Sequence, residues 1–100
     1  MYQIKIDKDA LKDLREIVKW YNEQSQNLGT RFHKQVKSQI NSLKTYPFVC
    51  TIRYQNIRCM LVKKFPFMIH YIVNEELNVE EIYSIFHTSR NPEIWNSEKR

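Results

Sequence analysis

Four polar side chains that could do chemistry follow one another near the end of the chain: His87, Thr88, Ser89 and Arg90. An imidazole titrates near neutral pH and can act as a general acid or base, while a guanidinium matches the oxygens of a phosphate group. Cutting RNA through its own 2′-hydroxyl needs a base, an acid and a cation near the phosphorane, and this stretch offers such groups. The alternative is that His87 only caps a strand by hydrogen bonding to the backbone.

Basic side chains from the middle of the chain could add to this stretch. No acidic residue lies between Glu23 and Glu75, although this interval contains a series of Lys and Arg residues: Arg31, Lys34, Lys37, Lys44, Arg53, Arg58, Lys63 and Lys64. Such a surface attracts phosphate backbones or an acidic protein by long-range steering, and the net charge of +5 acts in the same direction. A merely solvated basic face is the alternative.

The basic residues nearest the last strands are the expected contacts with a target or a protein partner: Arg53, Arg58, Lys63, Lys64 and Arg90. If the chain is a nuclease, Arg58 and Arg90 would be the cations of a catalytic site that also contains His87. No carboxylate pair, Ser-His-Asp set or glycine-rich phosphate loop is visible, so the catalytic interpretation rests on these three residues.

The elements that must position these residues begin with a strand. Residues Tyr2 to Ile6 alternate between apolar and polar side chains, which predicts a first strand. Asp7 or Asp9 can cap a helix, since apolar residues then recur at three- and four-residue steps. This first helix is expected to extend to about Gln24.

A second helix is expected after a short break at Leu28-Gly29-Thr30. We interpret Gly29 as a left-handed C-cap of the first helix and Thr30 as the cap of the second. The second helix ends at Tyr46-Pro47, because the residue before a proline is disfavoured in helical geometry. Its apolar stripe comprises Phe32, Val36, Ile40 and Leu43. The short connection predicts an antiparallel helical hairpin.

Residues typical of strands dominate the next part of the chain. Ile52 to Tyr54 and Ile57 to Val62 form either one interrupted strand or a hairpin, and strands follow from Phe67 to Val73 and from Val79 to Phe86. The last three should pair antiparallel, because they are close in sequence. The order β-α-α-β-β-β predicts an α+β fold with two layers, in which a helical hairpin packs on a small, mainly antiparallel sheet.

Length and composition exclude several classes of protein. One hundred residues, of which 42% are hydrophobic, suffice for a single domain spanning residues 1–100. No apolar run is long enough to span a membrane, and no apolar export signal opens the chain, so we expect a cytoplasmic protein without a membrane partner. Cys50 and Cys59 form no C-x-x-C pair and are expected to be reduced thiols. We expect no metal site and no cofactor.

Two residues beyond the polar stretch have a structural and a functional interpretation. Pro92 can open a short helical turn that Trp95 packs on the sheet. Alternatively, Trp95 belongs to the contact surface together with Arg90. Of the other histidines, His70 is expected to be packed or to face a partner, and His33 to lie on the surface.

Six short stretches then recur in the order and spacing of one family: Asp13-Leu-x-Glu16-Ile with Trp20-Tyr21, Leu28-Gly29-x-x-Phe32, Tyr46-Pro47, Ile57-Arg58, Phe65-Pro66-Phe67-x-Ile69-x-Tyr71, and His87-Thr-Ser-Arg90-Asn-Pro92-x-x-Trp95. Together they resemble the RelE/ParE toxins of type II toxin–antitoxin systems, of the plasmid-stabilisation type. The resemblance covers nearly the whole chain. It implies a small α+β protein that inhibits growth, that a cognate antitoxin neutralises, and that meets DNA only through the antitoxin.

The resemblance leaves two targets open. RelE-like members cut mRNA on the ribosome, whereas ParE-like members poison DNA gyrase. The nucleases carry an Arg on the third strand and usually a Tyr or His near the C-terminus, where this chain has Met68 or His70 and then Trp95. The resemblance is therefore closer to the ParE side, and gyrase inhibition is the expected function. An mRNA nuclease built on His87, Arg58 and Arg90 is the first alternative, and an inert antitoxin-binding protein is the second.

Overall fold

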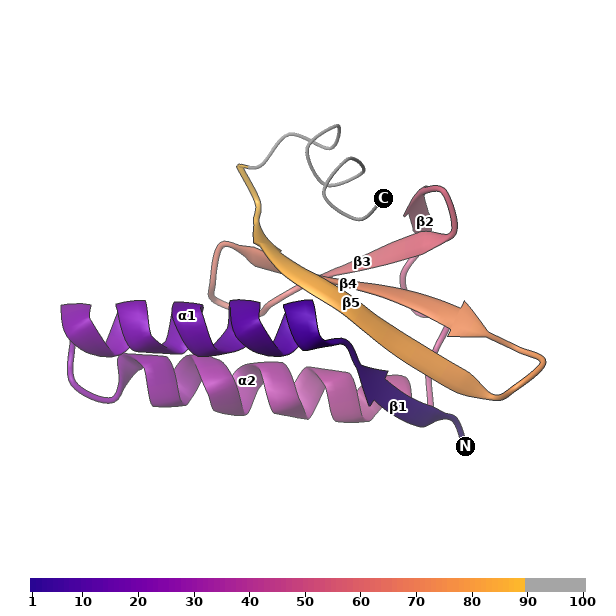
Figure 1. Cartoon of the computed structure of the whole chain (residues 1–100), viewed down its shortest axis with the longest axis horizontal. Coiled ribbons are helices and arrows are strands. Elements are labelled where there is room, and N and C mark those ends of the chain that lie inside the picture. The colour runs from indigo at the N-terminus through magenta and orange to yellow at the C-terminus, as the bar shows by residue number, and fades with distance from the viewer. Residues whose placement is uncertain (90–100) are drawn as a thin grey trace.

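The computed structural model describes residues 1–89, so Arg90, Pro92 and Trp95 lie outside the described residues. Two helices form one layer and a sheet forms the other (Figure 1). The elements are β1 (Gln3–Ile6), α1 (Lys8–Gln24), α2 (Leu28–Leu43), β2 (Ile52–Tyr54), β3 (Ile57–Leu61), β4 (Phe67–Asn74) and β5 (Val79–His87). This arrangement confirms the predicted α+β fold. No helix of the described part is long and apolar enough to cross a membrane.

The sheet has the strand order β1-β5-β4-β3-β2. β1 pairs parallel with β5, while the pairs β5–β4, β4–β3 and β3–β2 are antiparallel. The predicted antiparallel pairing of the last three strands is thus confirmed, and residues 52–62 form a hairpin rather than one strand. β1 comes first in the sequence but pairs with β5, so the chain's first and last strands lie side by side (Figure 1).

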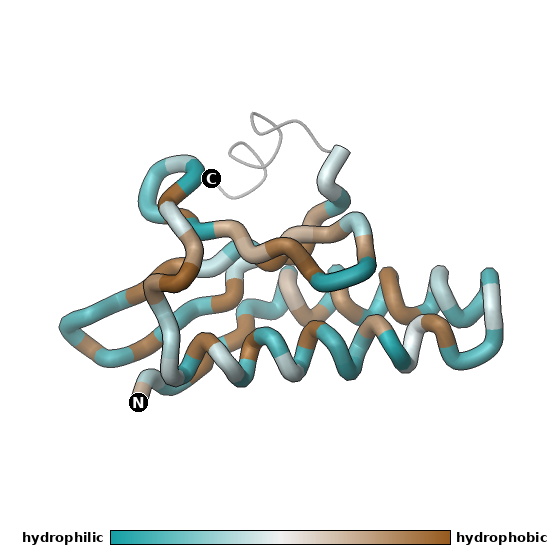
Figure 2. The backbone as a smooth tube through the Cα atoms, turned by 180° about the vertical axis from the view of Figure 1, so that it is seen from behind, coloured by the Kyte–Doolittle hydropathy of each residue, from teal (hydrophilic) through white to brown (hydrophobic). Residues whose placement is uncertain are grey.

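Both helices turn their apolar stripes toward the sheet. Along each helix, apolar residues recur between groups of polar ones (Figure 2), which is the pattern expected of a helix with one buried face. The core between the layers joins residues of both helices to residues of β4 and β5 and to Val62, which follows β3: Ala10, Leu14, Tyr21, Phe32, Val36, Ile40, Leu43, Val62, Ile69, Tyr71, Ile82 and Ile85. At one end this core becomes aromatic, since the Tyr21 and Phe32 rings both contact those of Phe65 and Phe67. This cluster places β4 against the hairpin.

The connection between the helices differs from the prediction. Asn27 adopts the left-handed conformation with φ of 65°, while Gly29 lies inside α2, and Thr30 is not the N-cap. The predicted capping roles of Gly29 and Thr30 were therefore wrong. Gly29 is needed for close approach instead: its backbone N–H donates to Asn22 Oδ1 at 2.7 Å, and a Cβ at this position would lie 2.1 Å from the carbonyl oxygen of Val18.

Candidate functional site

His87 ends β5 beside the β3–β4 turn, and it is exposed. Its ring packs edge-on against Phe67, the residue opposite it on β4, with ring centroids 5.1 Å apart. The Ser89 backbone N–H donates to its Nδ1 at 3.1 Å, and the Ser89 hydroxyl lies 2.8 Å from the same nitrogen. An Nδ1 that accepts leaves the proton of a neutral imidazole on Nε2. The ring is therefore held in one orientation at the strand end.

A hollow of about 240 Å³ adjoins His87. It lies between α1 and the end of the sheet, and its lining is formed by Asp13, Glu16, Ile17, Phe67, Ile85, Phe86 and His87. Asp13 Oδ2 accepts the backbone N–H of Ile85 at 3.0 Å, because β5 extends past the last residue of β1 and leaves this donor unpaired by a strand. Two carboxyl groups and no Lys or Arg of the described residues line the hollow.

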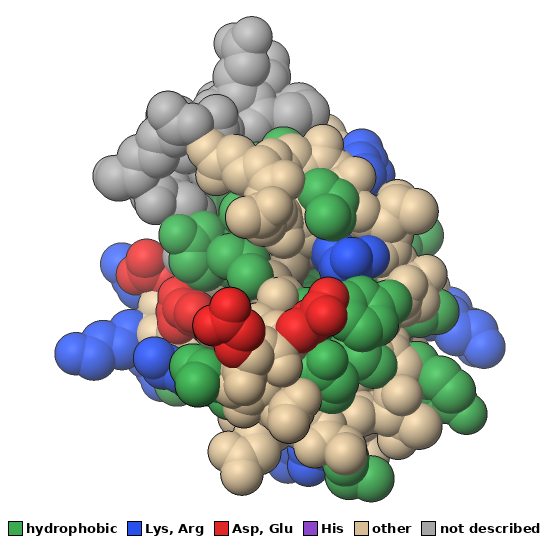
Figure 3. Space-filling model, turned by 90° about the vertical axis from the view of Figure 1, so that its right-hand side faces the viewer, with side chains coloured by type: hydrophobic (Ala, Val, Ile, Leu, Met, Phe, Trp, Pro, Cys, Tyr) green, Lys and Arg blue, Asp and Glu red, His purple; other side chains and the backbone are tan. Residues whose placement is uncertain are grey.

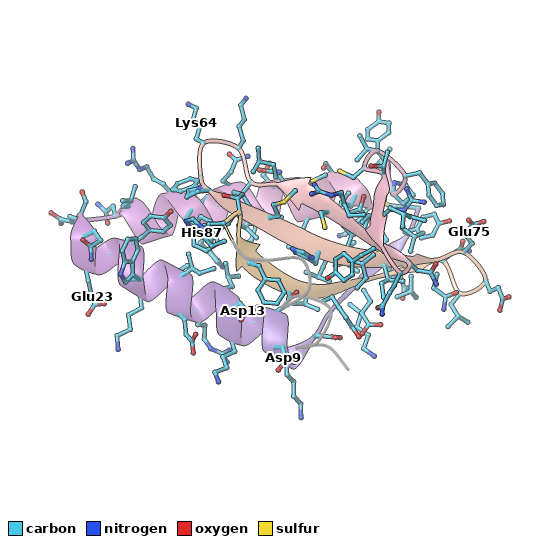
Figure 4. The ribbon with its side chains drawn as sticks, turned by 90° about the horizontal axis from the view of Figure 1, so that it is seen from above. Asp9, Asp13, Glu23, Lys64, Glu75 and His87 are labelled. Atoms are coloured by element: carbon cyan, nitrogen blue, oxygen red, sulfur yellow. The ribbon has the colours of Figure 1, made fainter. Side chains whose placement is uncertain are left out.

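Lys63 and Lys64 lie close to His87 along the molecule. They form the β3–β4 turn, and the Thr88 backbone N–H donates to the Pro66 carbonyl at 2.9 Å, which ties this turn to the end of β5. Figure 4 shows Lys64 and His87 at the same end of the sheet. The side chain of Gln39 on α2 fixes the turn from below, because its Oε1 accepts the Lys63 backbone N–H at 2.8 Å.

Arg58 belongs to a different part of the sheet. It stands opposite Tyr71 on β4, whereas His87 stands opposite Phe67, so four residues of β4 separate the two positions, roughly 13 Å along the strand. Its Nη1 donates to the Cys50 carbonyl at 2.5 Å, and its guanidinium lies 5.0 Å from the centre of the Phe48 ring. The structure thus brings Lys63 and Lys64 near His87 but not Arg58.

The other predicted contacts are dispersed. Arg53 is exposed on β2, the opposite edge strand from β1. Arg90 and Trp95 lie outside the described residues. The contact role of these side chains therefore stays a prediction.

His70 is fully buried and packed, as its alternation within the strand predicted. Its Nδ1 lies 3.0 Å from the Tyr54 hydroxyl and 3.4 Å from the Cys59 sulfur, on the sheet face away from the helices. Burial raises the pKa of the Cys59 thiol to about 11, so this sulfur is a poor nucleophile at neutral pH. Among residues 1–89, no group of three or more His, Cys, Asp and Glu side chains is arranged to hold a metal.

An apolar groove that runs between the two helices and reaches β1 was not predicted from the sequence. Two adjoining hollows of about 400 and 460 Å³ share Leu11, Leu14 and His33. Their rims carry only basic charges: Arg15, Lys19, Lys37 and Lys44. A signal was present in the sequence, because Leu11 extends the apolar stripe of α1 beyond the width that the sheet can cover.

Comparison with known proteins identifies the family. The model of the ParE toxin of the type II toxin–antitoxin system ParDE matches residues 4–92. The chain belongs to the ParE toxin family. It is accordingly a toxin of a type II toxin–antitoxin system, as the six stretches indicated. No match was found among the curated proteins.

Solved structures of the wider RelE/ParE group share the fold of this ParE-family toxin. The toxin of the chromosomal ParDE system from P. aeruginosa superimposes with a TM-score of 0.77 at 17% identity, over 89% of this chain and 98% of that one. For the intact E. coli RelBE complex the TM-score is 0.70 at 19% identity, over 90% of this chain and 100% of the matched chain. For isolated E. coli RelE the TM-score is 0.69 at 19% identity, over 100% of this chain and 98% of RelE. Both branches of the group thus have this architecture.

Proposed function

We propose that this toxin arrests growth in the cytoplasm by inhibiting DNA gyrase, and that a cognate antitoxin neutralises it. The observation that carries the proposal is the match of the ParE toxin family model to residues 4–92.

The position of Arg58 supports the same choice. A nuclease needs its cation within a few ångströms of the reacting phosphate, next to the general base. In this fold the guanidinium of Arg58 is engaged by Cys50 and Phe48, four β4 residues away from His87. The basic residues Arg53, Lys63 and Lys64, which are exposed, remain available as contacts to the target or the antitoxin.

Two purified systems test the proposal. The toxin is added to DNA gyrase with relaxed plasmid, and separately to translating ribosomes with a defined mRNA. We expect loss of supercoiling, and no cleavage of the mRNA. If the mRNA is cleaved and gyrase still supercoils the plasmid, the RelE-like nuclease replaces the proposal. If the toxin is inactive in both systems, it is an inert antitoxin-binding protein.

Substitution of His87 provides a second discriminating prediction. As a single exposed contact, His87→Ala is expected to weaken gyrase inhibition by less than about tenfold, because surface contacts rarely contribute more. A general base contributes about 10² to 10⁴ in rate, so a nuclease would lose nearly all activity. Dose–response curves of the variant and the wild type decide the point, with thermal unfolding as the control for folding.

For the antitoxin, the groove of the helical hairpin is the proposed binding site. It has an apolar floor and a rim of Arg and Lys side chains, so it fits an amphipathic segment with acidic flanks. The solved relatives include a RelE mutant bound to a peptide of its antitoxin RelB. Such a segment on the hairpin would leave the far edge of the sheet, at β2, uncovered.

Leu11→Asp is expected to lower antitoxin affinity at least tenfold, because it places a carboxylate in the apolar floor of the groove. Leu11 is exposed, so the fold should persist. The matched control is Leu77→Asp, at an exposed leucine of the β4–β5 turn that does not line the groove. Titration calorimetry with the purified antitoxin measures both variants, and equal affinities would remove the groove from the account.

A further inference from the structure

The loop between α2 and β2, together with the first residue of β2, presents large apolar side chains to solvent. Tyr46 is 66% exposed, Val49 63%, Ile52 51% and Phe48 47%, within seven consecutive positions. We call these four residues the apolar loop. Figure 3 shows hydrophobic side chains gathered on this end of the molecule, beside a group of acidic ones. Exposed apolar residues clustered in this way mark an interaction surface more often than scattered ones do.

Contacts on both sides hold the apolar loop in place. The Tyr71 hydroxyl, from the buried centre of β4, donates to the Pro47 carbonyl at 3.0 Å. Arg58 donates to the Cys50 carbonyl and places its guanidinium 5.0 Å from the centre of the Phe48 ring. The Val49 backbone N–H closes a turn on the Tyr46 carbonyl at 3.3 Å. Two side chains from the sheet therefore fix the loop backbone.

This rigidity gives Arg58 a positioning role. A loop that is already ordered loses little conformational entropy when it binds, so its exposed aromatic and branched side chains can contribute most of their burial to affinity. The same loop without anchors would be an aggregation hazard with no binding advantage. The apolar loop is thus both exposed and ordered before binding, and Arg58 is one of the side chains that order it.

We infer that the apolar loop is the surface by which this toxin contacts its protein target, and that the target offers an apolar cleft rimmed by carboxylates. The inference rests on the proposed function insofar as the target is a protein. Large apolar side chains fit a protein cleft, whereas a nucleic acid backbone calls for cations. Lys44 precedes the loop and the exposed Arg53 follows it, and no acidic residue occurs between Glu23 and Glu75.

Charge also argues against the other occupants. A second copy would bring the same loop with the same Lys44 and Arg53, and two chains of net charge +5 repel one another. The antitoxin has the separate groove of the helical hairpin. The acidic side chains of Glu75 and Glu76 belong to the β4–β5 turn, so the carboxylates of the target are expected on the Arg53 side of the loop and away from this turn.

The test replaces the two most exposed residues of the loop. In Tyr46→Ser/Val49→Ser the backbone turn and both anchors persist, so folding should be unchanged. Leu77→Ser, at a residue that is 70% exposed on the β4–β5 turn, is the matched control. Viable counts after induction measure growth arrest, calorimetry measures antitoxin affinity, and sedimentation equilibrium measures association of the purified chain. Thermal unfolding verifies the fold.

The expected result is loss of growth arrest by at least tenfold in viable counts for the loop variant only, with wild-type antitoxin affinity and a monomer in each case. Full growth arrest by the loop variant overturns the inference. A parallel loss of antitoxin affinity would assign the loop to the antitoxin, and a wild-type dimer that the variant dissociates would assign it to a second copy. Growth arrest without gyrase inhibition refutes only the gyrase proposal, while a harmless wild type refutes both.

Discussion

Gly29→Ala is expected to destabilise the fold by about 3 kcal/mol or more, a large part of the stability of a domain of this size. The added Cβ would lie 2.1 Å from the Val18 carbonyl oxygen and 2.8 Å from Asn22 Oδ1. Atoms cannot approach so closely, so α1 and α2 must separate. Separation also breaks the hydrogen bond from the Gly29 backbone N–H to Asn22 Oδ1 and loosens the core beneath it.

Chemical denaturation of Gly29→Ala measures this cost. Thr30→Ala is the control, since Thr30 is the exposed neighbour in the same turn of α2 and should change stability by less than about 0.5 kcal/mol. A second variant, Asn22→Ala/Gly29→Ala, should not recover stability, because the Val18 carbonyl remains in the way. Wild-type stability of Gly29→Ala would show that the helices do not pack as closely as described.

Glu80→Gln is expected to stabilise the protein above neutral pH and to have little effect in acid. Glu80 is fully buried, lies opposite Ile4 of β1 and Val73 of β4, and its carboxyl oxygens have no hydrogen-bond partner among the described residues. Burial raises the pKa of this carboxyl from 4.5 to about 7. An uncharged carboxyl is therefore the form that the core accepts.

The direction of the pH effect follows from proton binding. Below about pH 4.5 the carboxyl of Glu80 is protonated in both states and contributes no pH dependence. Between pH 4.5 and about 7 the unfolded chain releases this proton while the folded chain keeps it, so stability falls as pH rises. The total loss is about 3 kcal/mol, and it stays constant above pH 7.

Denaturation curves at pH 4.5 and pH 8.5 test this account of Glu80. The Glu80→Gln variant should exceed the wild type by about 3 kcal/mol at pH 8.5 and match it within about 1 kcal/mol at pH 4.5. Glu76→Gln is the control, because Glu76 is exposed in the β4–β5 turn and should leave the pH profile unchanged. An identical pH profile for Glu80→Gln and the wild type would mean that Glu80 ionises freely in the folded state.

The fold was largely predictable because its signals are local. The apolar stripe of α2 and the alternating residues of β4 each specify an element and the face it buries, and short connections specify the hairpins. The pairing of β1 with β5 was not predictable, since it joins strands that are distant in sequence. The role of Gly29 was missed for a similar reason: a close contact with Val18 leaves no periodic pattern.

The candidate site was predictable only in part. The strand end at His87 was predicted because polar residues follow an apolar strand. Lys63 and Lys64 lie near it because they belong to the β3–β4 turn, which a hydrogen bond joins to the end of β5. Arg58 looked like a partner of His87 because β3 is near β5 in sequence. In the sheet, β4 separates them, and the side chain of Arg58 serves the apolar loop instead. Which groups a side chain such as that of Arg58 contacts depends on tertiary packing, so it could not be predicted from the local sequence.

Pulse-labelling of DNA and protein synthesis shows which of the two processes this toxin stops first. The chain is induced in bacteria without its antitoxin, and incorporation of labelled thymidine and labelled methionine is followed through the first minutes. Gyrase inhibition predicts that DNA synthesis falls first while protein synthesis continues. If protein synthesis falls first, the gyrase proposal is contradicted and this ParE-family toxin acts on translation.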